Sequence, residues 1–256
     1  MTSPELTPAL PLAVDGGLSL PLDEALSLLR DGEMSIEGRL VDASNATFYC
    51  AVTCDGRSAA CVYKPVAGER PLWDFPDGTL AEREVAAYEI SAAAGWRIVP
   101  PTVYREGPAG PGMVQLWIDT DDTIDIARFM RRRDVEQLRH ISIFDAVINN
   151  ADRKGGHLLP TVGGHVYGVD HGVSFSVEDK LRTVLWQWAD ARLPRPCVDV
   201  LSCLRAELDR GLGQRLAELL TRREVRQTRL RIDRLLSTGR HPEPGDGWPP
   251  VPWPPI

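Results

Sequence analysis

Apolar and polar positions alternate in the N-terminal part of the chain, and this pattern predicts β-strands. Three consecutive strands are expected at residues 36–41, 47–53 and 59–63. Two more strands are expected at residues 99–103 and 112–118, separated by a turn-rich stretch. Ahead of the strands, residues 21–29 repeat apolar side chains at helical spacing, so a short helix is predicted there.

Residues 79–95 predict a buried helix between the two groups of strands. Thr79 and Glu82 have the spacing of a capping box, in which each side chain bonds a backbone amide of the first turn. Gly95 suits the C-terminal end, because glycine tolerates the left-handed conformation found there. Glu84 lies beside the apolar stripe of this helix, so its carboxylate is expected to face the neighbouring strands.

Beyond residue 119 the apolar spacing becomes mostly helical. Helices are expected at residues 124–129, 135–148, 200–208, 213–220 and 224–236. A short hairpin interrupts them, with strands at 158–162 and 165–169 joined by a Gly163–Gly164 turn. A run of strands followed by a run of helices is typical of an α+β fold.

Composition divides the chain into four parts. Residues 1–20 lack any period and are expected to be flexible, residues 21–118 are rich in strands, and residues 119–240 are mainly helical. The tail, residues 241–256, holds seven of the 21 prolines and two tryptophans. An extended tail is therefore predicted, either docked through its tryptophans or free.

Charge and hydropathy narrow the classes of partner. The 256 residues carry 36 acidic and 29 basic side chains, a formal net charge of −7, so binding of nucleic acid through the overall field is not expected. No apolar run is long enough for a transmembrane segment. A basic face on the predicted helix 224–236 leaves peripheral contact with a membrane open, although intramolecular docking explains its apolar residues equally well.

Five cysteines without a preceding signal peptide indicate reduced thiols, and a cytoplasmic location is expected. A zinc site built on Cys50 and Cys54 is disfavoured, because it lacks two further ligands at suitable spacing.

The candidate chemistry lies in residues 144–175, where polar segments interrupt apolar runs. Asp152 follows the predicted helix 135–148 in a glycine-containing loop, and Asp170 follows the second strand of the hairpin. The hairpin brings the chain back, so these two carboxylates are expected to converge. Two carboxylates beside a glycine-rich loop suit Mg²⁺, which binds oxygen ligands and substrate phosphates, and this arrangement favours phosphoryl transfer.

These residues resemble a known superfamily. The sequence Asn150-Ala151-Asp152-Arg153, followed eighteen residues after Asp152 by Asp170-His171-Gly172, resembles the catalytic loop and metal-binding D-x-G of atypical kinases, namely the phosphatidylinositol 3-/4-kinase superfamily and the HipA-type kinases. The chain is more closely similar to an actinobacterial protein family related to those lipid kinases. The resemblance covers most of residues 35–200. It implies a two-lobed protein-kinase-like fold, with a small β-rich N-lobe at 21–118 and a mainly helical C-lobe at 119–240.

The resemblance also implies roles for the loop residues. Asp152 would orient or deprotonate the acceptor hydroxyl, and Arg153 would stabilise the loop or the phosphate charge. Asp170 would bind Mg²⁺ or Mn²⁺, with His157 or Asn150 assisting. The family pattern D-R-H-x-x-N has a metal-binding asparagine where this chain has His157. Because imidazole prefers softer metals than Mg²⁺, the metal's identity and stoichiometry stay open.

For ATP, the resemblance points to the N-lobe. The turn at 42–47 would cover the phosphates through Ser44, Asn45 and Thr47, although by itself it is an ordinary turn. The strand at 112–118 would form the hinge that holds adenine, near Gln115 and Trp117.

Lys64 ends the third predicted strand and matches the ATP-binding lysine of these kinases. A snorkelling surface lysine is the alternative. Glu84 on the following helix would pair with Lys64 and hold its ammonium toward the nucleotide, with Glu89 as a second candidate on another face.

The resulting hypothesis is an ATP-dependent phosphotransferase with a protein, lipid or metabolite hydroxyl as acceptor. Nucleotidyl transfer of AMP on the same scaffold is one alternative. A nucleotide-binding pseudokinase is another, and the His157 substitution favours it. The segment after Gly172 has only isolated basic residues, which weakens the inositol-lipid interpretation specifically.

Overall fold

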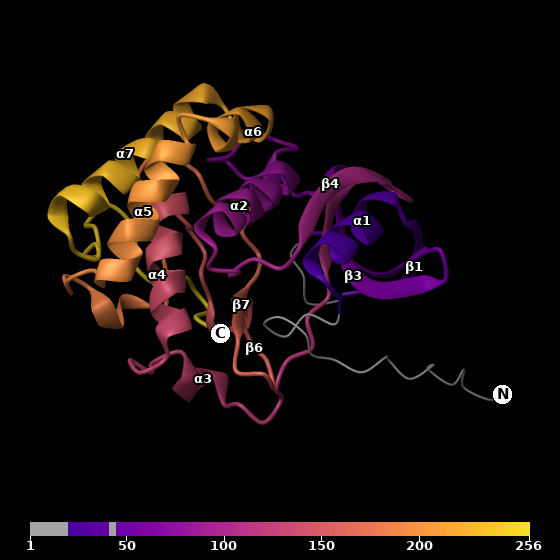
Figure 1. Cartoon of the computed structure of the whole chain (residues 1–256), viewed down its shortest axis with the longest axis horizontal. Coiled ribbons are helices and arrows are strands. Elements are labelled where there is room, and N and C mark those ends of the chain that lie inside the picture. Colours follow the sequence, from indigo (N-terminus) through magenta and orange to yellow (C-terminus); the bar gives the residue numbers. More distant parts are fainter. Residues whose placement is uncertain (1–19, 41–44) are drawn as a thin grey trace.

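The computed structural model describes residues 20–40 and 45–256 and shows a sheet-containing part and a helical part (Figure 1). The sheet has five antiparallel strands in the order β1-β2-β3-β5-β4. Their bounds are β1 Glu33–Arg39, β2 Phe48–Cys54, β3 Arg57–Pro65, β4 Thr102–Gly107 and β5 Gly110–Leu116. Helix α1 (Leu22–Asp31) packs against the sheet, as the apolar spacing of residues 21–29 predicts.

The β4–β5 hairpin corrects the sequence-based bounds. The stretch interpreted as turn-rich, residues 105–111, is mostly strand, and the reversal occupies only the residues between Gly107 and Gly110. Gly112 is needed for strand packing: a Cβ there would lie 2.4 Å from the carbonyl oxygen of Lys64 on β3. This glycine therefore lets two strands approach closely, which a sequence pattern cannot distinguish from a turn.

Helix α2 (Leu80–Ala94) lies between the sheet and the helical part (Figure 1) and contacts β4, β5, α5 and α6. The predicted capping box is wrong, because Thr79 makes no side-chain cap bond. The carboxylate of Glu69 accepts the amides of Leu80 (3.1 Å) and Ala81 (2.9 Å) instead. A carboxylate at a helix N-terminus satisfies unpaired amides and complements the helix dipole.

The helical part contains α3 (Ile126–Phe129), α4 (Glu136–Ile148), α5 (Arg195–Glu207), α6 (Gly211–Leu219) and α7 (Arg222–Thr238). The predicted hairpin is present as two short strands, β6 (Leu158–Pro160) and β7 (Val166–Gly168). Single-turn 3₁₀ helices are η1 (Val66–Gly68), η2 (Gly155–His157) and η3 (Trp186–Trp188). A continuous apolar core joins α2 to α4, α5, α6 and α7.

A buried ion pair fastens α2 to the helical part. Arg83 on α2 is 2% exposed, and its Nη2 lies 2.6 Å from Oε1 of Glu224 on α7. Its Nη1 donates to the backbone oxygen of Ser174 at 2.7 Å. Helix α2 is therefore held by charged bonds as well as by apolar packing.

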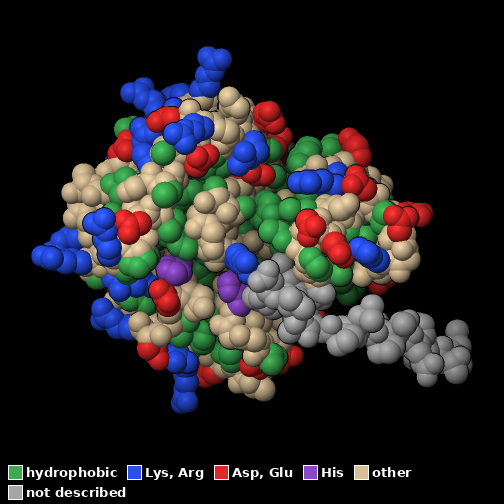
Figure 2. All heavy atoms as spheres, in the orientation of Figure 1, with side chains coloured by type: hydrophobic (Ala, Val, Ile, Leu, Met, Phe, Trp, Pro, Cys, Tyr) green, Lys and Arg blue, Asp and Glu red, His purple; other side chains and the backbone are tan. Residues whose placement is uncertain are grey.

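The proline-rich tail is docked. Trp248 stacks on Trp73 with ring centroids 5.9 Å apart, and Pro255 accepts the amide of Gly155 at 2.8 Å. All five cysteines of the described chain are free thiols. In residues 20–40 and 45–256, no helix combines the length and apolar character needed to cross a membrane. On the face in Figure 2, basic and acidic side chains are interspersed over both parts.

Candidate functional site

A cavity of about 610 Å³ lies where the sheet meets the helical part. It is large enough for a nucleotide-sized ligand. Strands β3 and β5, with residues between β1 and β2, form one wall, and the loops around β6 and β7 form the other. Its lining includes Asn45, Thr47, Lys64, Gln115, Trp117, Asp152, Lys154, His157 and Asp170. Most of the residues selected from the sequence thus come together around one cavity.

Lys64 sits at the centre of the charged groups. Strand β3 carries it opposite Met113 of β5, one residue before the strand ends at Pro65. Its Nζ lies 2.7 Å from Oε1 of Glu84 and 2.9 Å from Oδ1 of Asp170. Burial by itself lowers the pKa of Lys64, but the carboxylates of Asp170 and Glu84 outweigh burial and raise that pKa, so the ammonium stays charged.

Glu84 links the lysine to the loop after β7. Its side chain is buried, and its second oxygen, Oε2, accepts the backbone amide of His171 at 2.8 Å. The alternative, Glu89, points elsewhere and pairs with Arg215 of α6 at 2.5 Å. Glu84 is therefore the partner of Lys64, and the same carboxylate fixes the position of the Asp170-His171 backbone.

Asp170 adopts the left-handed backbone conformation, with φ of 61°. For a non-glycine residue this conformation is uncommon and is often found at functional sites. Its Oδ2 lies 3.3 Å from Nε2 of His157. The Lys64 ammonium holds the pKa of Asp170 well below its usual value, so the carboxylate is ionised. Burial lowers the pKa of His157, so its ring is neutral at pH 7.

Asp152 faces the same cavity with a partner that the sequence interpretation missed. Nζ of Lys154 lies 3.1 Å from Oδ2 of Asp152, and both side chains are partly exposed to the cavity. Lys154 could have been identified from the sequence, because it lies in the same polar loop, two residues after Asp152. The site thus contains two carboxylates and two ammonium groups around one space.

Asn150 and Arg153 lie behind the cavity rather than in it. Both are fully buried. Asn150 accepts the amide of Asp152 (2.9 Å) and donates to Asp145 (3.0 Å), so its side chain is not placed to bind a metal ion. Arg153 pairs with Asp145 at 2.9 Å and donates to the oxygen of Val169 at 2.9 Å. Of the two roles expected for Arg153, the geometry therefore supports stabilising the loop.

His171 closes this buried network. Its Nε2 lies 2.6 Å from Nη2 of Arg153, and its ring packs edge-on against Phe144. Burial, reinforced by the Arg153 charge, holds the pKa of His171 well below its usual value. The ring is therefore neutral and accepts from the guanidinium. Asp145 was missed as a site residue because it lies within a helical apolar run.

The predicted phosphate-covering turn and hinge also border the cavity. Asn45 accepts the amide of Arg70 at 2.9 Å, and Thr47 is buried beside it. Ser44 lies outside the described residues. Gln115 donates to Thr102 at 2.8 Å, which fixes its side chain, and Trp117 is 36% exposed with its backbone amide bonded to Ala60.

Comparison with known proteins gives a relative and a fold. No model of a protein family matches the chain. Protein Rv2133c of Mycobacterium tuberculosis is 43% identical over 93% of this chain and 98% of its own length. The crystal structure of a Golgi casein kinase superposes with a TM-score of 0.55 at 15% identity, covering 85% of this chain and 75% of that chain. At this identity the likeness shows the fold alone, so a kinase-like α+β fold with a sheet lobe and a helical lobe is confirmed.

Proposed function

The chain belongs to the family of Protein Rv2133c, and we propose that it is an ATP-dependent phosphotransferase that moves the γ-phosphate to an alcohol. One observation carries the proposal: Lys64 is held between Glu84 and Asp170 over a cavity that Asp152 also lines. Phosphoryl transfer relies on positioning and charge neutralisation by these few groups. The kinase-like fold supports the same conclusion.

The nucleotide would occupy the cavity between the sheet and the helical part. Lys64 would bind the α- or β-phosphate oxygens, since its charged ammonium is fixed by two carboxylates. Asn45 and Thr47 would lie over the phosphates. Trp117 and the backbone around Gln115 would border the adenine, where β5 leaves the sheet.

Asp170 would hold the metal ion that accompanies ATP, with the neutral imidazole of His157 3.3 Å away as a second donor. Among the described residues, no three His, Cys, Asp or Glu side chains gather closely enough to bind a metal ion by themselves. This donor set fits Mg²⁺ or Mn²⁺ that arrives with the nucleotide and keeps phosphate and water ligands. When bound, the ion would neutralise charge on the phosphates.

Asp152 would orient the acceptor hydroxyl and take its proton. Lys154, 3.1 Å from Asp152, would stabilise the charge that develops on the transferring phosphate. Asn150 and Arg153 would act through the loop, since the amide of Asp152 is bonded to Asn150 and the Arg153 guanidinium pins the loop from behind.

A pseudokinase is the second candidate, and one contact favours it. His157 lies against Oδ2 of Asp170, and the Lys64 ammonium lies against Oδ1, so both metal-binding oxygens already have partners. AMP transfer on the same scaffold is distinguished by which phosphate moves. We also propose, from the Asp152 and Asp170 motifs, that the chain is related to the phosphatidylinositol 3-/4-kinases and the HipA-type kinases.

The test uses purified protein with Mg²⁺ or Mn²⁺ and ATP labelled at the γ- or the α-phosphate, in the presence of a cell extract. We expect γ-label to appear in an acceptor with wild-type protein and not with Asp152→Asn. Label from the α-phosphate would instead indicate AMP transfer. Saturable ATP binding without transfer of either label would favour the pseudokinase.

A further inference from the structure

The tail forms a strap, residues 248–255, that lies along the segment after β7. Carbonyl oxygens of the strap accept hydrogen bonds from this segment. Pro250 accepts the amide of Thr183 (3.0 Å) and the indole N–H of Trp186 (2.8 Å), and Pro249 accepts Nε of Arg182 (3.0 Å). Farther along, Pro255 accepts the amide of Gly155 at 2.8 Å.

These donors flank the proposed catalytic residue. The backbone of Arg153 is paired with residues 182–184, because its amide donates to Arg182 (3.1 Å) and its oxygen accepts from Val184 (3.1 Å). Gly155 follows Asp152 by three residues. The strap therefore runs along the outer edge of the catalytic loop and its neighbouring segment.

That edge is what an extended polypeptide acceptor would need. Extended peptides are commonly held by backbone hydrogen bonds to an exposed edge. Here the amides of Gly155 and Thr183 are already bonded to the strap. The strap itself cannot hold a further peptide through backbone N–H groups, because it is mostly proline and proline has no N–H to donate. Its prolines are Pro249, Pro250, Pro252, Pro254 and Pro255.

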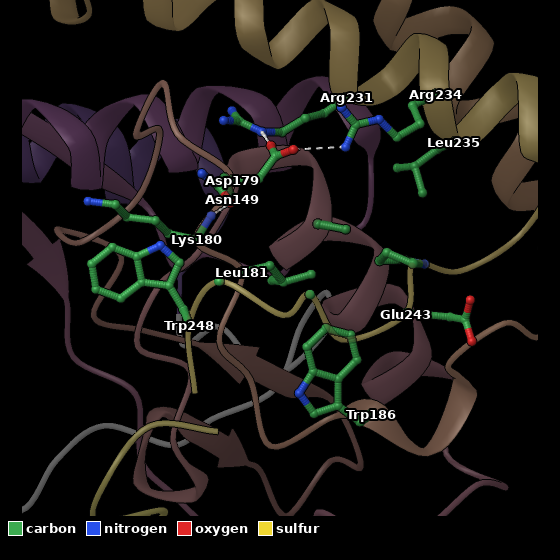
Figure 3. Close-up of a pocket in the computed structure, with 14 residues that line it drawn as sticks. Asn149, Asp179, Lys180, Leu181, Trp186, Arg231, Arg234, Leu235, Glu243 and Trp248 are labelled. Carbon is green, nitrogen blue, oxygen red and sulfur yellow. Dashed lines mark hydrogen bonds and ion pairs between the residues drawn. The ribbon is translucent and has the colours of Figure 1, made fainter. Parts of the chain in front are cut away.

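The strap is anchored where it begins. Trp248 stacks on Trp73, and the ammonium of Lys180 lies 4.7 Å from the Trp248 ring and 5.0 Å from the Trp73 ring. Figure 3 shows Lys180 extending across Trp248, with Trp186 at the opposite side of a cavity of about 200 Å³. Lys180 is also paired with Asp74 at 3.0 Å. Proline restricts the backbone of the undocked strap as well as the docked one, so docking costs little conformational entropy.

We propose that the strap excludes extended polypeptides and that the acceptor is a compact small-molecule alcohol, which reaches Asp152 through the cavity. This inference rests on the proposed phosphotransferase function. The tail would thereby select the class of acceptor.

The experiment compares wild-type protein, Trp248→Ala and a matched control, Trp253→Ala, in the full chain. Trp253 is 86% exposed, so its removal leaves the anchor intact. Each protein is incubated with γ-labelled ATP and Mn²⁺ and offered either the low-molecular-weight filtrate of a cell extract or dephosphorylated casein, an unfolded polypeptide. Hydrogen exchange of the Gly155 and Thr183 amides reports strap docking without any activity. Loss of the tryptophan stack should speed exchange of the Thr183 amide about tenfold in Trp248→Ala only.

We expect Asp152-dependent label in the filtrate and none in casein with wild-type protein and Trp253→Ala. Label in casein or in extracted lipid with wild-type protein would overturn the inference. So would label that enters casein only with Trp248→Ala while the filtrate stays unlabelled, since the strap would then be a releasable inhibitor of a protein kinase. Unprotected Gly155 and Thr183 amides in wild-type protein would overturn it as well. Absence of both ATP binding and transfer, with those amides protected, would instead remove the proposed function on which the inference rests.

Discussion

Replacement of Glu84 by glutamine tests the charged centre of the site with almost no change in shape. The two oxygens of Glu84 accept from the Lys64 ammonium (2.7 Å) and the His171 amide (2.8 Å). The Glu84→Gln side chain has one acceptor oxygen, so its amide group must face one of these donors. Breaking a buried charged pair costs about 3–5 kcal/mol, and the lower end applies because Lys64 keeps Asp170.

Lys64 also loses the carboxylate that holds its ammonium toward the phosphates, so we expect kcat/KM for phosphate transfer to fall about 100-fold, which is about 3 kcal/mol of transition-state stabilisation. The melting temperature should fall by about 6–12 °C, because 1 kcal/mol shifts a protein of this size by about 2–4 °C. The control is Glu89→Gln on the same helix, which removes only a partly exposed pair with Arg215 and should change kcat/KM little. A Glu84→Gln enzyme with kcat/KM within about threefold of wild type, a shift of under 1 kcal/mol, would show that Glu84 does not position Lys64 for phosphate transfer.

Three further outcomes are expected. Lys154→Ala should lower the rate of transfer by about 10- to 100-fold while ATP affinity is kept, because the Lys154 ammonium lies beside Asp152 and not beside Lys64. Equal losses in rate and in ATP affinity would argue against this role of Lys154. Arg83→Met should destabilise the fold by about 3–5 kcal/mol in urea unfolding, and adding Glu224→Gln should recover part of that loss, since the second charge is no longer left unpaired. Burial lowers the pKa of His241 to about 4, below its unfolded value of about 6.5, so unfolding takes up a proton and stability is lost as pH falls through this range. His241 should contribute about 2 kcal/mol of this loss by pH 5, and His241→Gln should flatten the profile; an unchanged profile would contradict the assignment.

The sequence was most informative where chemistry and local structure coincide. Lys64 ends a strand just before a proline, and Asp170 follows a hairpin that returns it toward Asp152, so their convergence depends on neighbouring elements only. Glu84 could be chosen because it lies next to a buried stripe on one helix. These inferences need only the periods of strands and helices.

The remaining features depend on contacts between distant parts of the chain. Glu69 caps α2 from a loop, which overrides the capping box that Thr79 suggests. The Asp145 carboxylate binds Arg153 inside the fold, and a single acidic residue in an apolar helix gives no sign of its partner. The docking of Trp248 on Trp73 joins residues 175 positions apart, so composition predicted an extended tail but left its position open.

Whether the cavity holds a nucleotide is tested by titrating ATP into wild-type protein and Lys64→Met with Mn²⁺ present and measuring binding by calorimetry. We expect saturable binding at one site, weakened at least about tenfold in Lys64→Met, because a charged hydrogen bond to phosphate is worth about 1.5 kcal/mol or more. Equal ATP binding by the two proteins would remove Lys64 from the nucleotide site. Absence of ATP binding by folded wild-type protein would show that this cavity does not hold a nucleotide and that the protein is not an ATP-dependent phosphotransferase.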